Sequence, residues 1–357
     1  MSEVWNHYGP TAARPAGTPG RLARRAAVTI DVHCHVAVPA AQNLVAPHLD
    51  VGRIPLVRFA TEETRALNRK QDQDRAPNFV SHDQRLADMD AAGIDVQIVS
   101  PPPGQCYVGL PAEVAVPAVR MVNDGLAEFV ARRPDRFRAL GTVAMEYPDA
   151  AVAELERCMG SLGMKGVEIL THIEGRELSD PLFAPFWAAA ERLGAVVMIH
   201  PNGFSDGARL SRYYFSNVIG NPLETTIALH YLIFDGVLER HPNLKILAVH
   251  GGGYLGAYPG RIDHAWGARS DCRGQLPHPP TSYFSRIYVD SVVFTPGQLA
   301  QLVETFGVGH VLMGTDYPFD MAEADPIGHI ASVPGFDQAT RAAIEGDNAA
   351  RLFGITR

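Results

Sequence analysis

Short apolar runs of strand length alternate with longer helical patterns from about residue 27 to the end of the chain. Most runs are apolar on both faces, which is typical of strands buried in a parallel sheet. Because a helical pattern follows each run, the sequence predicts repeated strand–helix units. The eight runs lie at residues 26–33, 94–100, 137–145, 166–170, 195–201, 245–251, 287–293 and 310–318.

The helical patterns lie at residues 82–92, 112–133, 148–162, 182–193, 222–240, 254–268, 296–306 and 338–353. Ser81 precedes the first of them as a candidate N-cap. Eight strand–helix units predict an α/β chain folded as a (β/α)8 TIM-like barrel, regular or distorted. A doubly wound open sheet is the alternative, but no G-x-G-x-x-G motif follows the first run to support it.

We expect one domain over residues 27–357, preceded by a flexible or surface-draped leader at 1–26. The leader holds several prolines, glycines and arginines but no apolar stretch of the kind that an export signal needs. Residues 36–80 separate the first run from its helix and are far longer than a usual βα loop, so they predict an insertion over the barrel mouth. Its arginines could contact an anionic substrate, although charged loop residues are usually solvated; they are Arg53, Arg58, Arg65, Arg69 and Arg75.

The charge balance excludes several partners. With 31 basic and 39 acidic residues the formal net charge is -8, and no basic cluster in the body of the chain would follow a phosphate backbone, so we expect no nucleic acid partner. No apolar run approaches the roughly 20 residues of a membrane span. The four cysteines are widely scattered, which favours a reducing cytoplasm over a disulfide framework.

Polar residues follow several runs at the point where the predicted strand ends. His33 and His35 stand one residue apart, so they point to the same side of a strand while Cys34 points away. His200, His250 and Asp316 end three later runs. In a barrel of this type the carboxyl ends of the strands form one face, where active sites lie. The sequence therefore predicts one cluster of imidazoles and a carboxylate, a combination that can hold a divalent metal.

The order H-x-H, H-P, H-G-G-G and G-T-D-Y-P-F resembles the amidohydrolase superfamily, in its decarboxylase branch. That branch includes 2-amino-3-carboxymuconate 6-semialdehyde decarboxylase. The likeness runs from about residue 28 to the end of the chain and takes in M-D-x-x-G-I-D-V at 89–96 and G-R-I-D-H at 260–264. The resemblance implies that the metal ligands are His33, His35, His200 and Asp316. It also implies that His250 is the catalytic acid or base.

Three imidazoles and one carboxylate suit Zn²⁺ first and Mn²⁺ second, and we expect one ion per chain. Hydrolytic relatives with two ions bridge them with a carboxylated lysine at the fourth strand, but Lys165 precedes that strand and lies at its wrong end. Glu168 and His172 face inward there. We assign both to hydrogen bonding in the core, with His172 near enough to the mouth to contact substrate.

The sequence differs from other members of the branch at positions expected to line the substrate pocket. Asn202 and Gly203 stand where the resemblance leads us to expect a pocket tryptophan, so an aromatic wall becomes small and polar. We assign Asn202, His172 and Phe319 to the substrate pocket. Arg269 falls where members of the branch donate an arginine across a dimer interface, which favours a homodimer and a small carboxylated substrate.

We expect a metal-dependent decarboxylase without an organic cofactor, acting on an aromatic acid or an unsaturated ring-cleavage product such as a carboxymuconate semialdehyde. The alternative is a hydrolase of a lactone, amide or ester, in which Asp316 would take a proton during attack on a carbonyl. A catalytically silent ligand-binding barrel is a third hypothesis. The complete set of candidate ligands argues against it, and no glycine-rich nucleotide loop supports a redox or phosphotransfer enzyme.

Overall fold

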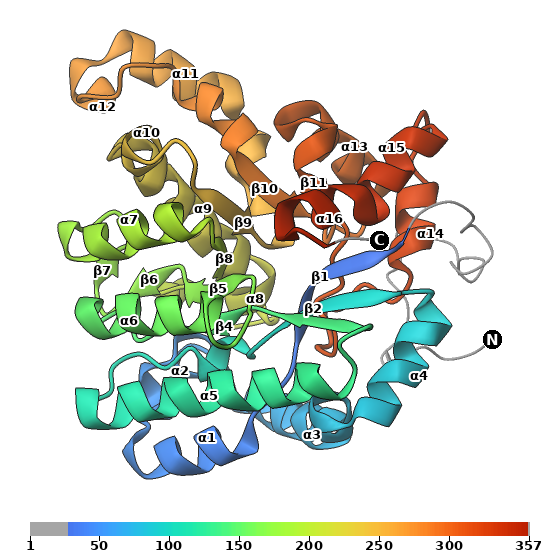
Figure 1. Cartoon of the computed structure of the whole chain (residues 1–357). Coiled ribbons are helices and arrows are strands. Elements are labelled where there is room, and N and C mark those ends of the chain that lie inside the picture. Colours follow the sequence, from blue (N-terminus) through green and yellow to red (C-terminus); the bar gives the residue numbers. More distant parts are fainter. Residues whose placement is uncertain (1–27, 356–357) are drawn as a thin grey trace.

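Parallel strands form the centre of the molecule (Figure 1), and the computed structural model describes residues 28–355. The leader predicted for residues 1–26 lies outside the described residues. A three-stranded sheet has the order β1-β2-β3, and a six-stranded sheet has the order β11-β10-β9-β8-β5-β4. The strands are β1 (Ile30–His35), β2 (Val96–Ser100), β3 (Phe137–Ala139), β4 (Gly141–Thr142), β5 (Gly166–Leu170), β8 (Val196–His200), β9 (Lys245–Ala248), β10 (Ile287–Asp290) and β11 (Val311–Leu312).

The two sheets meet at both of their edges. Leu140 alone separates β3 from β4. At the other edge Cys34 forms a parallel bridge with Tyr317, and the Val32 amide donates to the Met313 carbonyl over 2.9 Å. Every pairing within the two sheets is parallel, so the predicted α/β fold with parallel sheets is confirmed.

Helices follow the strands much as the sequence predicts. The first of the predicted helices begins after Ser81, whose hydroxyl accepts a hydrogen bond from the Gln84 amide, so the predicted N-cap is confirmed. Helix α4 (His82–Ala92) precedes β2. The helices after β2 are α5 (Ala112–Arg132), α6 (Pro148–Met159), α7 (Ala184–Leu193), α8 (Phe215–Val218), α9 (Gly220–Phe234), α10 (Val237–Arg240), α11 (Pro259–Ala268), α12 (Ser270–Arg273), α13 (Pro296–Phe306), α14 (Pro326–Ala331), α15 (Gln338–Ala342) and α16 (Asn348–Phe353).

The segment between β1 and α4 is largely helical. It contains α1 (Pro39–Val45), α2 (Pro55–Arg58) and α3 (Glu62–Val80). Helix α1 packs against α5 on the outside of the fold, whereas the Leu56 amide of α2 donates to the Asn202 carbonyl beyond β8. One part of this segment therefore covers a helix, and another part reaches the carboxyl ends of the strands. A short antiparallel pair, β6 (His172–Ile173) and β7 (Arg176–Glu177), follows β5 in sequence.

Strand β8 shows how the apolar pattern positions a polar side chain. Val196 and Met198 pack in a cluster of strand residues that α16 closes, while Val197 and Ile199 pack in the cluster shared with the surrounding helices. Because side chains alternate along a strand, His200 shares the face of Val196 and Met198. The last residue of β8 therefore points to the side on which the strands face one another.

Strand β1 departs from this simple alternation. Ile30 and Val32 belong to the cluster of strand residues, but Cys34 belongs to the cluster shared with the helices. The pairing of β1 with β2 shifts register between Asp31 and Cys34. An irregularity of this kind re-aims the side chains that follow it. It brings His33 and His35 to the side that Ile30 and Val32 occupy.

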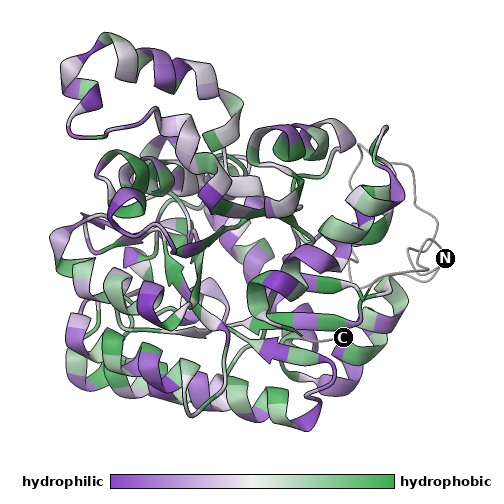
Figure 2. Cartoon of the chain, turned by 45° about the horizontal axis from the view of Figure 1, so that its top comes forward, coloured by the Kyte–Doolittle hydropathy of each residue, from purple (hydrophilic) through white to green (hydrophobic). Residues whose placement is uncertain are grey.

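Figure 2 shows hydrophobic residues, coloured green, mostly along the central strands and on one side of the helices, as expected for elements that bury one face. The arm formed by α11 and α12 stands away from the rest of the fold, and neither helix contains a buried residue. No helix within residues 28–355 is long and apolar enough to cross a membrane. The division into a leader and one domain stays a prediction.

Candidate metal centre and active site

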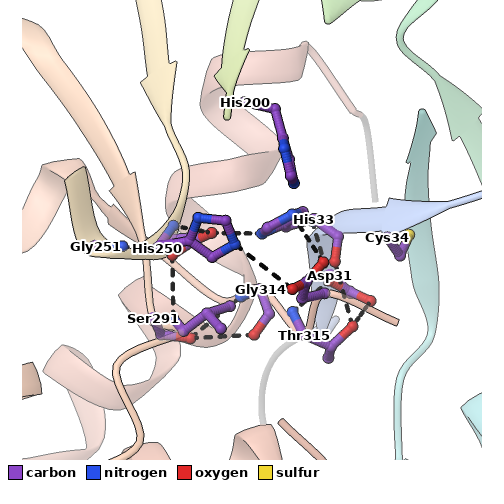
Figure 3. A network of polar contacts seen from close by, with 12 residues as sticks. Asp31, His33, Cys34, His200, His250, Gly251, Ser291, Gly314 and Thr315 are labelled. Atoms are coloured by element: carbon purple, nitrogen blue, oxygen red, sulfur yellow. Dashed lines mark hydrogen bonds and ion pairs between the residues drawn. The ribbon is translucent and has the colours of Figure 1, made fainter. Parts of the chain in front are cut away.

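Three histidine rings face one another at the carboxyl ends of the strands (Figure 3). His33 comes from β1, His200 ends β8, and His250 follows β9 in a short turn, His250–Gly252. The ring centroids of His33 and His200 lie 5.1 Å apart, and those of His200 and His250 also lie 5.1 Å apart. The predicted orientation of Cys34 is confirmed, because its thiol donates to the Ile98 carbonyl and points away from the rings.

The hydrogen bonds of the histidines leave one nitrogen of each ring for a metal. The Nδ1 atom of His33 lies 2.7 Å from Asp290 Oδ2, that of His35 lies 2.9 Å from the Pro101 carbonyl, and that of His200 lies 2.7 Å from the Pro201 carbonyl. An oxygen at Nδ1 fixes the proton there and leaves Nε2 as an acceptor. Within the described chain, all three Nε2 atoms are buried without a hydrogen-bond partner. Buried nitrogens with this pattern are typical of metal ligands.

Asp316 joins these rings through both of its oxygens. Oδ1 lies 3.3 Å from Nε2 of His33 and 3.3 Å from Nε2 of His35, and Oδ2 lies 3.5 Å from Nε2 of His250. Four ligand atoms, from His33, His200, His250 and Asp316, lie within 4.8 Å of one another. Imidazole and carboxylate groups at these separations fit a divalent metal ion.

This group of four contains His250 and not His35, although His35 also lies beside Asp316, so proximity alone does not select the ligands. The side chain of His35 is fully buried, whereas that of His250 is 15% exposed. His250 also lines a cavity, as described below. The chain has a divalent metal site here, and the division of roles between His35 and His250 stays a proposal.

The surroundings of the cluster shift the pKa values of Asp316 and His200. Burial raises the pKa of Asp316, but the neighbouring His33 and His250 outweigh this effect and hold it well below its usual range. Burial and the nearby His33 and His250 rings hold the pKa of His200 well below the ordinary value for histidine. At neutral pH the carboxylate is therefore ionised and His200 is neutral, which are the forms that bind metal.

Two of the cluster residues adopt a backbone conformation that is rare outside glycine. The φ angle is 54° at His250 and 65° at Asp316. Such conformations cost free energy and persist where surrounding contacts hold them, often at functional sites. Their occurrence at two residues predicted from the sequence supports a functional role for both.

Asp290 is a residue of the site that the sequence analysis did not identify. It is fully buried at the end of β10 and accepts hydrogen bonds from the His33 ring and from the His250 and Gly251 amides. The available signal was a lone carboxylate inside the seventh apolar run, residues 287–293; the structure ends the strand at this residue, on the face where strand ends carry functional groups. Asp31 was also missed; it accepts from the amides of His33 and Thr315.

His250 and Asp316 line a cavity of about 310 Å³, which we call the His250 cavity. Its walls include Val292, Val293 and Phe294 from the segment after β10. Its lining also includes three side-chain amides, those of Asn217, Asn221 and Gln298. The candidate acid or base therefore faces a space that could hold a small, mainly apolar molecule.

A second cavity of about 290 Å³ lies between the segment after β1 and the ends of β5 and β8, and we call it the insertion cavity. Asn202 and His172 both line it, together with the side chains of Arg53, Arg58 and Glu224. The two cavities share a wall, because the Gly203 amide of the insertion cavity donates to the Asn221 side chain of the His250 cavity over 2.8 Å. Burial lowers the pKa of His172, so its ring is neutral.

The remaining predicted residues occupy different places. The Phe319 ring lies 5.1 Å from the His35 ring, so the structure brings it to the metal cluster. Glu168 is buried, with Oε2 3.8 Å from His35 Nδ1. Arg269 is not brought to the site within its own chain: it follows α11, is 67% exposed and pairs with Asp271.

Known proteins share this fold and sequence. The family model described as Amidohydrolase matches residues 30–355. A 2-amino-3-carboxymuconate-6-semialdehyde decarboxylase of Dictyostelium discoideum is 32% identical over 91% of each chain. The crystal structure of 5-carboxyvanillate decarboxylase LigW from Sphingomonas paucimobilis has a TM-score of 0.80 and 28% identity, covering 93% of this chain and 100% of that one.

A further crystal structure, 2,6-dihydroxybenzoate decarboxylase complexed with 2,6-dihydroxybenzoate, has a TM-score of 0.75 and 25% identity, covering 92% of this chain and 100% of that one. Together with the buried histidine cluster, these matches define a metal-dependent enzyme on an α/β fold. The chain belongs to the amidohydrolase family. Within that family it is a metal-dependent decarboxylase, a carboxy-lyase, as the sequence analysis predicted.

Proposed function

We propose that the enzyme removes one carboxyl group, as CO₂, from an aromatic acid or an unsaturated ring-cleavage product such as a carboxymuconate semialdehyde. The observation that carries the proposal is the position of His250, which borders both the cluster of buried Nε2 atoms and a cavity of about 310 Å³. A proton donor beside a space of this size suits protonation of a small substrate. The names of the three relatives described above support the substrate class.

We further propose that His33, His35, His200 and Asp316 hold one ion, Zn²⁺ first and Mn²⁺ second. Three nitrogens and one carboxylate oxygen match the preferences of both ions. When bound, the ion supplies Lewis-acid chemistry, polarising an oxygen of the substrate. The chain itself orients the three rings through the oxygens at their Nδ1 atoms, which keeps the ligand geometry fixed.

His250 then serves as the proton donor. It gives a proton to the carbon that bears the carboxylate, and the bond between that carbon and the carboxyl carbon breaks. The electron pair of the bond stays with the substrate carbon, so the products are CO₂ and the protonated organic residue. Asp316 Oδ2 lies 3.5 Å from His250 Nε2, close enough for the carboxylate to attract the protonated ring and keep it beside the cavity. His250 regains its proton from solvent, to which its side chain is 15% exposed.

For substrate binding we retain Asn202, His172 and Phe319 as candidates. The first two line the insertion cavity, and Phe319 packs beside His35. Arg269 is assigned to the active site of a partner copy in a homodimer. The exposed α11–α12 arm, which contains no buried residue, supports this assembly. The buried, unpaired cysteines Cys34, Cys106 and Cys158 support a cytoplasmic protein.

We also propose that the two parallel sheets form one distorted (β/α)8 barrel with an insertion after its first strand. The hydrogen bonds from β1 to the segment after β11, and the single residue between β3 and β4, support a closed ring of strands. In such a barrel the five cluster residues lie at the carboxyl ends of strands.

The experiment that tests the function measures CO₂ release from a panel of hydroxybenzoates, carboxyvanillates and carboxymuconate semialdehydes, together with elemental analysis of the protein. We expect about one divalent ion per chain and CO₂ from at least one class. His200→Ala should lose both the ion and the activity. Full metal retention in this variant would remove His200 from the ligands, and no CO₂ from any class would overturn the proposed substrate.

A further inference from the structure

One buried carboxylate connects the metal cluster to the turn that carries the proposed proton donor. Asp290 Oδ2 lies 2.7 Å from His33 Nδ1 and accepts from the His250 amide over 3.0 Å. Asp290 Oδ1 accepts from the amides of Gly251 over 2.8 Å and Val292 over 3.1 Å. All four bonds are buried or nearly so, and Asp290 itself is 0% exposed. Both carboxylate oxygens of Asp290 therefore form hydrogen bonds with residues of the site or of the turns beside it.

We propose that Asp290 is a positioning residue with two simultaneous functions: it fixes the ring of His33 for metal binding, and it fixes the backbone of His250 for proton transfer. The second function rests on the role of His250 in the proposed reaction, whereas the first depends only on the metal site. Asp290 is fully buried and lines neither cavity, so it acts through these two histidines.

The effect on His33 follows from the chemistry of the imidazole ring. A carboxylate can only accept a hydrogen bond, so its contact with Nδ1 requires the proton of the neutral ring to be on Nδ1. The lone pair is then on Nε2, which points to His35, His200 and Asp316. Partners of this kind orient metal-ligating histidines and strengthen their binding.

The effect on His250 follows from its backbone. The φ angles of His250 and Gly251 are 54° and 63°, and the amides of these two consecutive residues both point at Asp290. Consecutive amides in a left-handed turn form a concave site for an anion. Asp290 fills that site from within the chain and so holds His250 in a conformation that a residue with a Cβ rarely adopts.

An asparagine at this position has the same shape but cannot make the same contacts. If its oxygen replaces Oδ1, its NH₂ group faces the Nδ1 atom of His33 and the amide of His250, which are both donors. His33 can then bond only by accepting at Nδ1, which moves its proton to Nε2 and blocks the metal-facing atom. If the amide turns over, the same conflict arises with the amides of Gly251 and Val292. Either orientation therefore damages one of the two functions.

The test compares Asp290→Asn with wild type in two measurements on folded protein. Competition with a chromogenic chelator gives the affinity of the metal-free chain for Zn²⁺, without any substrate. We expect the variant to bind Zn²⁺ about 10- to 100-fold more weakly. At saturating metal we expect kcat to be at least about 10-fold lower with KM changed less than about 2-fold, because the proton donor is displaced.

The matched control is Glu154→Gln, which neutralises another buried carboxylate. Glu154 lies on α6, is 3% exposed and bonds to Asn123 and Arg157, but to none of the site residues. We expect its Zn²⁺ affinity and kcat to equal those of wild type. An Asp290→Asn protein that binds Zn²⁺ as tightly as wild type would overturn the proposal. If wild type releases no CO₂ from any acid, the proposed function fails but the Zn²⁺ arm still decides the role of Asp290 toward His33.

A second measurement needs no altered Asp290 and keeps the proposal testable if that variant does not fold. The ring nitrogens of ¹⁵N-histidine-labelled, Zn²⁺-loaded wild type are observed by NMR, and the His33 signals are assigned by their loss in His33→Gln. We expect the His33 proton on Nδ1. A His33 ring protonated at Nε2 in the loaded protein would overturn the proposal.

Discussion

The His250 cavity and the insertion cavity share a wall but are built from different material. The described residues that line the His250 cavity include no lysine or arginine, and its imidazole and carboxylate groups come from His250 and Asp316. The insertion cavity contains Arg53 and Arg58, together with the carboxylates of Glu174 and Glu224. One cavity therefore has a catalytic pair in a mainly apolar space, and the other has many charges that could recognise a polar group.

The difference indicates that this fold places its catalytic groups and its substrate-recognition groups on different parts of the chain. The residues of the metal cluster lie in the last part of β1, at the end of β8, or within four residues after β9 and β11, where parallel strands position side chains rigidly. The insertion cavity draws one wall from the segment between β1 and α4, and Arg53 there is more than half exposed. Loops on a rigid scaffold commonly vary in this way among relatives. Substitutions in the His250 cavity should alter kcat, and substitutions in the insertion cavity should alter substrate affinity.

The largest effect is expected at His250. His250→Ala should keep its metal and its fold while kcat falls by about 10²- to 10⁴-fold, because the proton donor is lost. His250→Asn keeps much of the shape and isolates the proton role. Metal content, melting temperature and CO₂ release are measured on one preparation. Loss of the metal would make His250 a ligand in place of His35, and normal turnover in the loaded variant would remove it from the chemistry.

A smaller effect, on KM and not on kcat, is expected from a substitution in the insertion cavity. Asn202→Trp places a large ring into a space of about 290 Å³. We expect KM to rise by about 3- to 10-fold with kcat within about 2-fold of wild type, since uniform binding is lost and the transition-state contacts are kept. Steady-state kinetics on the best substrate decide this. A drop in kcat at constant KM would show that the two cavities are not separate in function.

The smallest effect concerns stability against pH. Burial raises the pKa of Glu224 to about 7, while its hydrogen bonds to Ser205 lower it in part. A carboxyl group whose folded-state pKa is raised stabilises the fold below its unfolded value of 4.5, and this contribution is lost as the pH rises through about 7. Glu224→Gln stays neutral at every pH. The melting temperature of the variant minus that of wild type should therefore increase by a few degrees as the pH rises from 4.5 to about 7.

Thermal scans of both proteins from pH 4 to pH 8 check this prediction. Glu128→Gln, a change at an exposed position on α5, serves as the control and should follow wild type at every pH. Parallel curves for wild type and Glu224→Gln would mean that the carboxylate of Glu224 is already well accommodated in the cavity.

Much of the site could be predicted because its residues stand at the ends of apolar runs. His200 illustrates this, since the alternation of Val196 to Ile199 alone assigns its side. The pairing of His33 with His35 was also readable from their spacing. The register shift that brings both to the side of Val32 was not, because it depends on the partner strand β2 and leaves no mark in the sequence of β1.

The parts that escaped prediction depend on contacts between distant segments. Asp290 and His33 are separated by 257 residues, and a lone carboxylate in an apolar run gives no sign of its partner. Asn202 lines the insertion cavity and not the His250 cavity, and the hydrogen bond between Gly203 and Asn221 joins two segments that are not adjacent in sequence. Local patterns report which way a side chain faces but not which distant group it meets.

Removal and return of the metal tests the central claim most directly. The purified enzyme is stripped with a chelator, and CO₂ release from its best substrate is measured before and after Zn²⁺ or Mn²⁺ is added in equal amount to the protein. We predict that the stripped protein stays folded, releases no CO₂ above the uncatalysed rate, and recovers its activity at about one ion per chain. Full activity in the stripped protein, with no metal detected, would contradict the account.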